Sequence, residues 1–310
     1  MSLYAPPVEK DTEIWTKLPD GYRRHGAQPD WARGNRPGQV VDCFLEGPSF
    51  DRAGNLYVTD IPFGRVFRIS PDGEWVLVAE YEGWPNGLKI HRDGRIFITD
   101  YKRGIMQLDP QSGAVTTFLV HRKSESFRGV NDLFFDARGR MYFTDQGQTG
   151  MHDPTGRVYR YDMERDQLDL LVANGPSPNG LVMNPAEDVL YVAMTRGNAV
   201  WRVPIHPDGG TAKVSIFTAM AGGHSGADGM AVDRDGRLFV CDAGNGCVWV
   251  LTDEARPVYR LNAASGGRST TNLAFGGVDN RDLFITESST GTILKVTMDV
   301  PGEPMFAHRD

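Results

Sequence analysis

Six similar segments recur along this 310-residue chain, and they predict an all-β protein, a six-bladed β-propeller with four-stranded blades. The segments begin at residues 46, 86, 131, 179, 228 and 272, so successive starts lie 40 to 49 residues apart. Each reads as a short apolar strand, an Asp-Gly or Arg-Gly-like turn, and a second strand rich in aromatic and β-branched residues. The apolar residues alternate with period two, whereas a helical repeat would show 3.6-residue spacing.

Further strands complete each predicted blade. The segments themselves are 46–60, 86–100, 131–145, 179–194, 228–242 and 272–287. A third strand is predicted at 64–70, 156–162, 198–203, 246–251 and 291–296. Fourth strands are indicated by EWVLVAE, AVTTFLV, LDLLVA and AKVSIFT. Four strands in a unit of this length are typical of a propeller blade.

The two ends of the repeat region suggest how the domain is bounded. Residues 1–35 are rich in Pro, Asp and Arg and show little periodicity, so we expect an N-terminal extension that packs over the outside or one mouth. Residues 36–310 are then predicted to form one propeller domain. The segment 38–45, GQVVDCFL, reads as a strand that would complete the last blade and close the ring.

Composition excludes several classes of partner. The formal net charge is −7 and no basic stripe occurs, so a nucleic-acid partner is not expected. No apolar run reaches the length of a membrane span, and the first residues lack the pattern of a secretory signal. Cys43, Cys241 and Cys247 form no C-x-x-C motif and read as small buried hydrophobes. We expect a cytoplasmic protein without an obligatory protein partner.

A ring of oxygen-bearing side chains is the main functional feature. The residue that opens each segment carries a carboxylate or an amide: Glu46, Asn86, Asn131, Asn179, Asp228 and Asn272. Because the innermost strands of a propeller run around one channel, these residues are expected at one height, facing the axis. Such donors suit one hard divalent cation, Ca²⁺ first, with Mn²⁺, Mg²⁺ or Zn²⁺ as alternatives. Alternatively, the Asn-Gly and Asp-Gly pairs are turn residues copied with the repeat.

Four segments carry a resemblance to a known family. LEGPSFDRAGNLYVTD, GVNDLFFDARGRMYFTD, PSPNGLVMN and GADGMAVDRDGRLFV resemble the gluconolactonase family, which includes regucalcin (senescence marker protein), luciferin-regenerating enzyme and, more distantly, diisopropylfluorophosphatase. The resemblance covers roughly residues 40–297. It implies a divalent-metal-dependent lactonase of the carboxylic-ester hydrolase type, with a small lactone as substrate. The implied metal ligands are Glu46, Asn179 and Asp228, with Asn131 as a fourth, direct or water-bridged ligand.

The resemblance also implies roles around the metal. Asp228 would be the catalytic residue, either taking a proton from the attacking water or only holding the metal. Asp132 either orients Asn131 or is an ordinary buried carboxylate. Substrate contacts are predicted for Asn131, Asp132, Asn86, His224, Trp84 and Thr271. Loops at the same mouth would add Phe63, Phe127, Gln148, His152 and Met194 as candidate pocket walls.

One departure from the family leaves the substrate open. Sugar-lactone members often have an arginine two residues before the Asn-Asp pair, where this chain has Gly129, so either a sugar lactone or a less polar γ-lactone remains in view. Two other functions also remain: a phosphotriesterase or fluorophosphatase using the same metal, and a non-catalytic propeller that binds a ligand or protein. The ring of metal-binding side chains argues against a strictosidine-synthase-like propeller. No G-x-S-x-G, H-E-x-x-H or P-loop motif is present.

Overall fold

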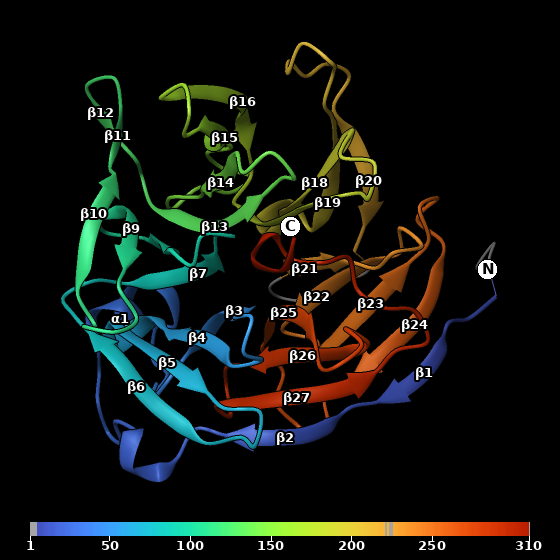
Figure 1. Ribbon diagram of the computed structural model, residues 1–310. Coiled ribbons are helices and arrows are strands. Elements are labelled where there is room, and N and C mark those ends of the chain that lie inside the picture. Colours follow the sequence, from blue (N-terminus) through green and yellow to red (C-terminus); the bar gives the residue numbers. More distant parts are fainter. Residues whose placement is uncertain (1–4, 221, 223–225, 310) are drawn as a thin grey trace.

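The computed structural model describes residues 5–220, 222 and 226–309, which form six sheets arranged as blades around a central axis (Figure 1). The all-β, six-bladed propeller with four-stranded blades is therefore confirmed. The blades follow one another along the chain, and each is built from its innermost strand outward. Within the described ranges, no helix is long and apolar enough to cross a membrane.

The first four blades each consist of four consecutive antiparallel strands. Blade 1 comprises β3 (Leu45–Phe50), β4 (Leu56–Asp60), β5 (Arg65–Ile69) and β6 (Trp75–Glu80). Blade 2 comprises β7 (Pro85–Ile90), β8 (Ile96–Asp100), β9 (Gly104–Leu108) and β10 (Val115–Leu119). Blade 3 comprises β13 (Val130–Phe135), β14 (Met141–Asp145), β15 (Gly156–Asp162) and β16 (Gln167–Gly175). Blade 4 comprises β17 (Pro178–Met183), β18 (Val189–Met194), β19 (Ala199–Pro204) and β20 (Ser215–Ala219).

The last two blades include strands from the N-terminal region. Blade 5 comprises β21 (Gly226–Val232), β22 (Leu238–Ala243), β23 (Cys247–Leu251) and β24 (Pro257–Asn262), and β1 (Val8–Asp11) adds a fifth, parallel strand. Blade 6 comprises β25 (Thr270–Gly276), β26 (Asp282–Glu287), β27 (Thr292–Thr297) and, as its outermost strand, β2 (Glu13–Lys17). The prediction that 38–45 closes the ring is therefore wrong, because β2 does so. Instead Val41 and Phe44 pack in a cluster with Trp31.

Short elements connect or cover the blades. A small hairpin, β11 (His121–Arg122) and β12 (Glu125–Ser126), projects between blades 2 and 3. The α-helix α1 (Asp30–Asn35) precedes blade 1. The described residues also form the 3₁₀ helices η1 (Asp20–Tyr22), η2 (Ile61–Phe63), η3 (Thr195–Gly197) and η4 (Phe306–His308). Two strands of the predicted 1–35 extension thus belong to blade sheets, while the domain boundary at residue 35 stays a prediction.

A threonine on the second strand links blades 1, 2 and 3 each to the next blade. It belongs to the repeated Thr-Asp pair and donates to the backbone carbonyl of the next ring residue. Thr59 Oγ1 donates to Asn86 O at 2.6 Å and Thr144 Oγ1 donates to Asn179 O at 2.8 Å. Because these carbonyls are buried, each bond fixes the relative height of two inner strands. This repeat feature therefore sets the geometry of the ring.

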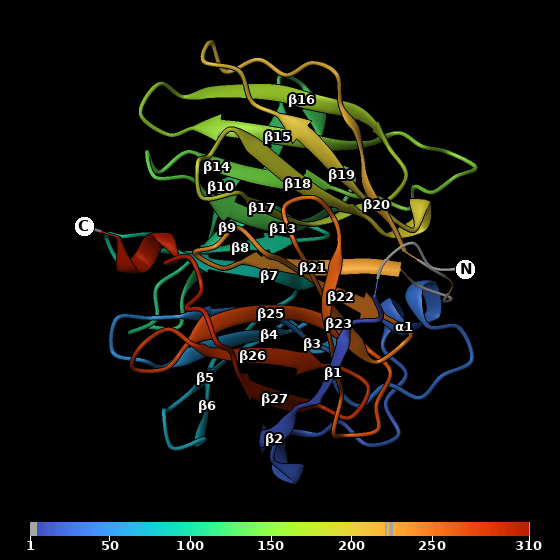
Figure 2. The same ribbon diagram turned by 90° about the vertical axis from the view of Figure 1, so that its right-hand side faces the viewer.

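The two mouths of the channel are covered by different segments. Figure 2 shows α1 on one face of the propeller and the C-terminal segment on the opposite face. The C-terminal segment is held by Arg309, which donates to Glu187 Oε1 at 2.7 Å, and by Arg52, which donates to Ala307 O at 2.7 Å. Phe306 packs against Phe135 with ring centroids 5.6 Å apart. These contacts hold the C-terminal segment over that mouth.

Candidate catalytic and metal-binding site

The six ring residues all lie on innermost strands and are all buried. Their exposed fractions are between 2 and 8 %. In every blade the register between the first and second strand shifts at this position, as between Glu46 and Ser49 in blade 1. A bulge of this kind breaks the alternation of a strand and redirects its side chains. Every blade therefore has a register shift at its ring position, and this shift is the local feature that redirects the side chains there.

The glycine after a ring residue permits close contact between blades. A Cβ built on Gly87 would lie 2.4 Å from Asp132 Oδ1, and one on Gly180 would lie 2.5 Å from Asp228 O. Both glycines lie inside strands, β7 and β17, rather than in turns. The alternative interpretation of the Asn-Gly pairs as turn residues is therefore wrong. A side chain there would force neighbouring inner strands apart.

Side chains from three blades meet at the axis. Asn272 Nδ2 donates to Glu46 Oε2 at 2.9 Å and to Asp132 Oδ2 at 3.1 Å. These residues belong to blades 6, 1 and 3, so their contact spans the channel. Glu46 Oε2 also accepts from Gly47 N at 2.9 Å, and Asp132 Oδ1 accepts from Leu133 N at 2.8 Å. The structure thus places Asp132 as a buried, hydrogen-bonded carboxylate rather than as a partner of Asn131.

Burial and mutual repulsion perturb the three carboxylates at the axis. Burial and then Asp132 raise the pKa of Glu46 to about 7, against donation from Gly47 and Asn272. Burial raises the pKa of Asp228 well above its ordinary value, and the charges of Glu46 and Asp132 raise it further. Burial also raises the pKa of Asp132. The cluster is therefore unfavourable as three anions unless a cation joins it.

One carboxylate oxygen in this cluster is unsatisfied. Asp228 Oδ1 is buried and has no hydrogen-bond partner, which normally costs about 1–3 kcal/mol or more for a charged group. Within the described ranges no three His, Cys, Asp or Glu side chains are grouped to hold a metal. A cation here would consequently need amide oxygens in addition to Glu46 and Asp228. Asn131 and Asn179, on inner strands β13 and β17, carry such oxygens, and the donor chemistry fits a hard cation.

A polar chain leads from the ring to the mouth beside α1. Asn131 Nδ2 donates to Gln146 Oε1 at 3.0 Å, and Gln146 Nε2 donates to Ser177 Oγ at 3.0 Å. Ser177 has a φ of 65°, a left-handed conformation that is rare for serine. Its N–H donates to Thr149 Oγ1 at 3.1 Å. Strained polar residues of this type are frequent at functional sites.

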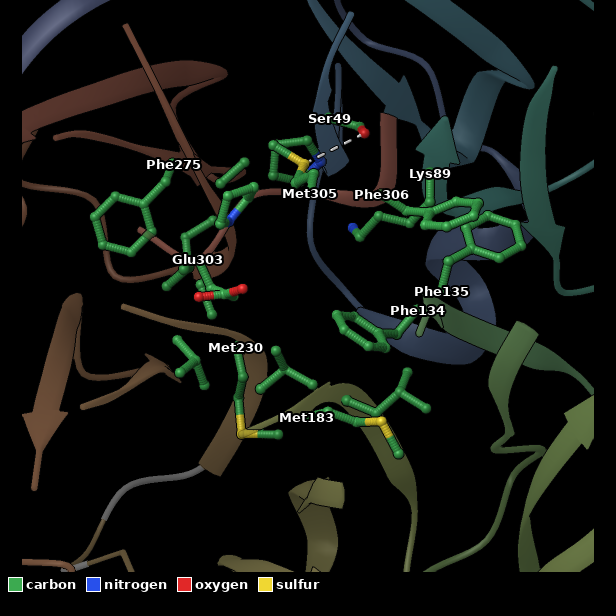
Figure 3. Close-up of a pocket in the computed structure, with 18 of the residues that line it drawn as sticks. Ser49, Lys89, Phe134, Phe135, Met183, Met230, Phe275, Glu303, Met305 and Phe306 are labelled. Atoms are coloured by element: carbon green, nitrogen blue, oxygen red, sulfur yellow. Dashed lines mark hydrogen bonds between the residues drawn. The ribbon is translucent and has the colours of Figure 1, made fainter. Parts of the chain in front are cut away.

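Two cavities lie on opposite sides of the ring. The mouth beside α1 contains a cavity of about 570 Å³, lined among others by Asn35, Gln146, Ser177 and Arg196. The other cavity, shown in Figure 3, measures about 60 Å³ and lies against the C-terminal segment. Its walls are mostly apolar, with the Lys89 ammonium directed into it. At roughly 10–15 Å³ per water it holds a few water molecules, so only the larger mouth suits a substrate.

The remaining predicted contacts lie in different places. Asn86 is buried on β7, and its carbonyl accepts from Thr59. Trp84 packs against the cluster around Trp31, and Lys102 lies 4.3 Å from the centroid of its ring. His224 lies outside the described residues. The substrate roles predicted for these three residues stay predictions.

Thr271 serves a structural contact instead of lining a cavity. It is 1 % exposed, donates to Leu45 O at 3.1 Å and contacts Thr286 Oγ1 at 3.0 Å. The predicted substrate contact at this residue disagrees with that position, because the hydroxyl links blade 6 to blade 1. Of the other candidate walls, Gln148 and His152 line the larger mouth. Phe127 and Met194 lie in hydrophobic clusters between strands.

Three cationic residues near the ring had no signal in the sequence. Lys89 lowers the pKa of both Glu46 and Asp132, while Arg36 and Arg196 lower the pKa of Asp228. Arg36 follows α1 in a segment without periodicity, and Arg196 lies in the 3₁₀ helix η3. An inspection limited to the first residue of each repeated segment could not identify these three residues.

The ring of Tyr101, in the turn after β8, occupies the space beside Gly129, the position of the family arginine. A Cβ on Gly129 would lie 2.6 Å from Cζ of Tyr101. An arginine at this position would therefore displace the Tyr101 ring. The substitution that the sequence shows therefore has a packing reason.

Comparison with solved structures identifies the same fold. The calcium-binding protein regucalcin from Agrobacterium tumefaciens superposes with a TM-score of 0.74 at 19% identity, covering 96% of this chain and 99% of that one. The gluconolactonase XC5397 from Xanthomonas campestris gives 0.72 at 21% identity, with 90% and 96% covered. Luciferin-regenerating enzyme gives 0.75 at 16% identity, with 85% and 94% covered.

Sequence comparison extends this similarity. Lactonase drp35 of Staphylococcus aureus is 29% identical over 228 residues, which cover 70% of this chain and 69% of that protein. The lactonase drp35 of Staphylococcus epidermidis is 30% identical over 229 residues, with the same coverage. The family model described as SMP-30/Gluconolactonase/LRE-like region matches residues 44–289. That span runs from the first blade into the last, and the chain belongs to this family.

Proposed function

We propose that this protein is a divalent-metal-dependent lactonase that opens a small lactone to the hydroxy acid. The observation that carries the proposal is the buried Asp228 Oδ1, unpaired beside the Glu46 carboxylate in a family that contains lactonases. Glu46, Asn131, Asn179 and Asp228 would hold the cation, Ca²⁺ first. When bound, the cation would polarise the lactone carbonyl and stabilise the negative charge that develops on its oxygen.

The chain's own residues account for the remaining steps. The polar chain from Asn131 through Gln146 to Ser177 lines the path by which a lactone reaches the ring. Asp228 would accept a proton from the attacking water while the water oxygen bonds to the carbonyl carbon. The ring C–O bond then breaks, and the proton passes from Asp228 to the departing alkoxide. Asp228 Oδ1 has no hydrogen-bond partner in the protein, so this oxygen is available to accept that proton.

The C-terminal segment over the far end of the channel supports entry of the substrate from the side of α1. The C-terminal segment leaves only a cavity of about 60 Å³ on that side, so water and lactone would enter past α1. The inner strands give the site a rigid frame, since each is buried between neighbouring blades. Loops at the mouth can then vary in sequence without disturbing the ring.

The test is lactone hydrolysis by chelator-treated protein with Ca²⁺, Mn²⁺, Mg²⁺ or Zn²⁺ added back. The panel contains aliphatic γ-lactones, aldonolactones and one phosphotriester. We expect turnover of a lactone only when a cation is present, and loss of at least about 100-fold in kcat/KM for Asp228→Asn. Asp235→Asn, in an exposed turn of the same blade, is the charge-matched control and should keep full activity. Turnover of the phosphotriester alone, or lactone turnover that survives Asp228→Asn, would contradict the proposal.

A further inference from the structure

Two arginines stand at the larger mouth, on the side from which a substrate would approach Asp228. Arg196 lines the 570 Å³ cavity together with Gln146 and Ser177. Arg36 directly follows Asn35, which lines the same cavity. The charges of both arginines lower the pKa of Asp228, so the fold brings two residues 160 positions apart in sequence near one carboxylate.

Both arginines are attached to well-anchored segments. Trp31 on α1 packs against Phe44 with ring centroids 4.7 Å apart, and the backbone N–H of Arg36 donates to Ala32 O at 2.8 Å. The Arg36 guanidinium lies over the Phe44 ring at 5.0 Å and donates to Ser269 Oγ at 3.4 Å. Its position is therefore set by packing, and a guanidinium has five N–H donors, so others remain for a ligand.

The second arginine is held next to the catalytic strand. Thr195, its neighbour in η3, donates from Oγ1 to Ala227 O at 2.8 Å, one residue before Asp228. The N–H of Thr195 donates to Ser177 O at 3.0 Å. A Cβ on Gly226 would lie 2.5 Å from Thr195 O, so η3 is pressed against the start of β21. The backbone that carries Arg196 is thereby held against the start of β21, and the Arg196 side chain itself is exposed at the cavity.

The charges at the site favour an anion once a divalent cation is present. Glu46, Asp132 and Asp228 face the axis, and the nearby Glu287 is already held by backbone donors including Ser269 N at 2.9 Å. Arg36 and Arg196 act on Asp228, whereas Lys89 acts on Glu46 and Asp132 from the side of the smaller cavity. A divalent cation would offset the charges of Glu46 and Asp228, so the two arginines would leave positive charge on the substrate side. A positive concave site attracts anionic ligands and suppresses cationic ones.

We propose that Arg36 and Arg196 bind a carboxylate on the substrate, so that the substrate class is a lactone carrying an acidic substituent. This inference rests on the proposed lactonase function and narrows it. Planar guanidinium groups match a carboxylate through paired N–H donors, which neutral lactones lack. The carboxylate would orient the ring ester toward Asp228.

The kinetic test compares two lactones that differ only in charge. Butyrolactone-3-carboxylate and its carboxamide are assayed with the cation that supports turnover. We expect kcat/KM for the carboxylate to exceed that for the carboxamide by at least tenfold. Arg196→Met and Arg36→Met should each reduce that ratio at least fivefold, mainly through KM. Arg33→Met, an exposed arginine on α1 that pairs with Asp30, is the matched control and should leave the ratio unchanged.

A binding measurement gives a readout that does not depend on turnover. Tetrahydrofuran-2-carboxylate and its carboxamide contain no lactone ester that the enzyme could open. Calorimetry should show that the native chain binds the carboxylate more tightly than the carboxamide. This difference should be lost in Arg196→Met and also in Arg196→Lys, because lysine lacks the planar guanidinium group that pairs with a carboxylate. Melting temperatures establish that each variant is folded. Equal kcat/KM for both lactones in the native chain would overturn this inference while leaving the lactonase intact. Turnover of neither lactone, nor of the wider panel, would instead remove the proposed function.

Discussion

At the scale of single residues, Asp228 combines features that rarely serve stability. Its carboxylate is buried, one oxygen is unpaired, and Glu46 and Asp132 repel its charge. Removing such a charge from the metal-free protein should therefore relieve strain, while removing it from a working site should abolish function. Functional residues often show this opposition between stability and activity.

Asp228→Asn should raise the melting temperature of the chelator-treated protein by at least about 2 °C, because a neutral amide replaces a buried carboxyl whose ionisation Glu46 and Asp132 oppose. The same variant should lose the rise in melting temperature that Ca²⁺ gives to the native chain. Differential scanning calorimetry with and without Ca²⁺ measures both effects. Asp235→Asn serves as control. A lower melting temperature for metal-free Asp228→Asn would show that the carboxylate has a stabilising role instead.

The pKa of Glu46 gives a second expectation at this scale. Its folded pKa is about 7, against an ordinary value of 4.5, so the folded protein binds more protons than the unfolded chain between these pH values. The free energy of unfolding therefore falls as pH rises from 4.5 to 7, and this loss is complete above pH 7. Glu46→Gln removes the effect. In metal-free protein, the melting temperature of Glu46→Gln relative to the native chain should rise between pH 5 and pH 8, and a constant difference would contradict it.

At the scale of elements, the repeat identified the blades well because each is a local unit of alternating strands. The third strands of blades 1, 3, 4, 5 and 6 lie where the sequence predicted them, in aromatic and β-branched runs that follow a glycine or asparagine. The closing strand could not be found in this way. β2, EIWTK, is half exposed and pairs with β27 some 280 residues later, so it carries no clear alternation. The apolar residues of 38–45 pack against α1 instead, which no periodicity reveals.

The sequence predicted the ring residues of the candidate site but not the residues around them. The ring residues share one position in the repeat, so their common burial followed from the pattern. Thr271 shares that neighbourhood in sequence, but the bulge turns it toward Leu45 and Ser288 rather than a cavity. The register shift that decides between these directions is a property of strand pairing. Arg36 and Arg196 depend on how α1 and η3 dock, which a single sequence does not encode locally.

The glycines after the ring residues allow a prediction about elements. Gly180→Ala should destabilise the protein by at least about 2 kcal/mol, because its Cβ would meet the backbone of Asp228 at 2.5 Å. Gly34→Ala, on α1 with open space around its Cβ, is the matched control and should be neutral or slightly stabilising. Chemical denaturation measures both. Equal effects of the two changes would mean that the inner strands can move apart easily.

At the scale of the whole molecule, ring closure depends on a strand from the other end of the chain. β2 supplies the outer edge of blade 6, and its Thr16 Oγ1 donates to Gly73 O at 3.0 Å and accepts from Trp75 Nε1 at 3.0 Å in blade 1. One short strand thus fastens the last blade to the first. β1, in contrast, only extends the outer edge of blade 5.

Two truncations separate these roles. Removal of residues 1–12 takes away β1 and should lower the melting temperature only slightly, since blade 5 keeps four strands. Removal of residues 1–18 also takes away β2, leaves the edge of β27 unpaired and breaks the bond to Trp75, so we expect a loss of cooperative unfolding and a tendency to aggregate. Calorimetry and light scattering on both chains measure the difference. If the two truncated chains melt alike, packing between blades 6 and 1 must hold the ring closed without its strand, and the closure would belong to the inner strands and their Thr271 contact.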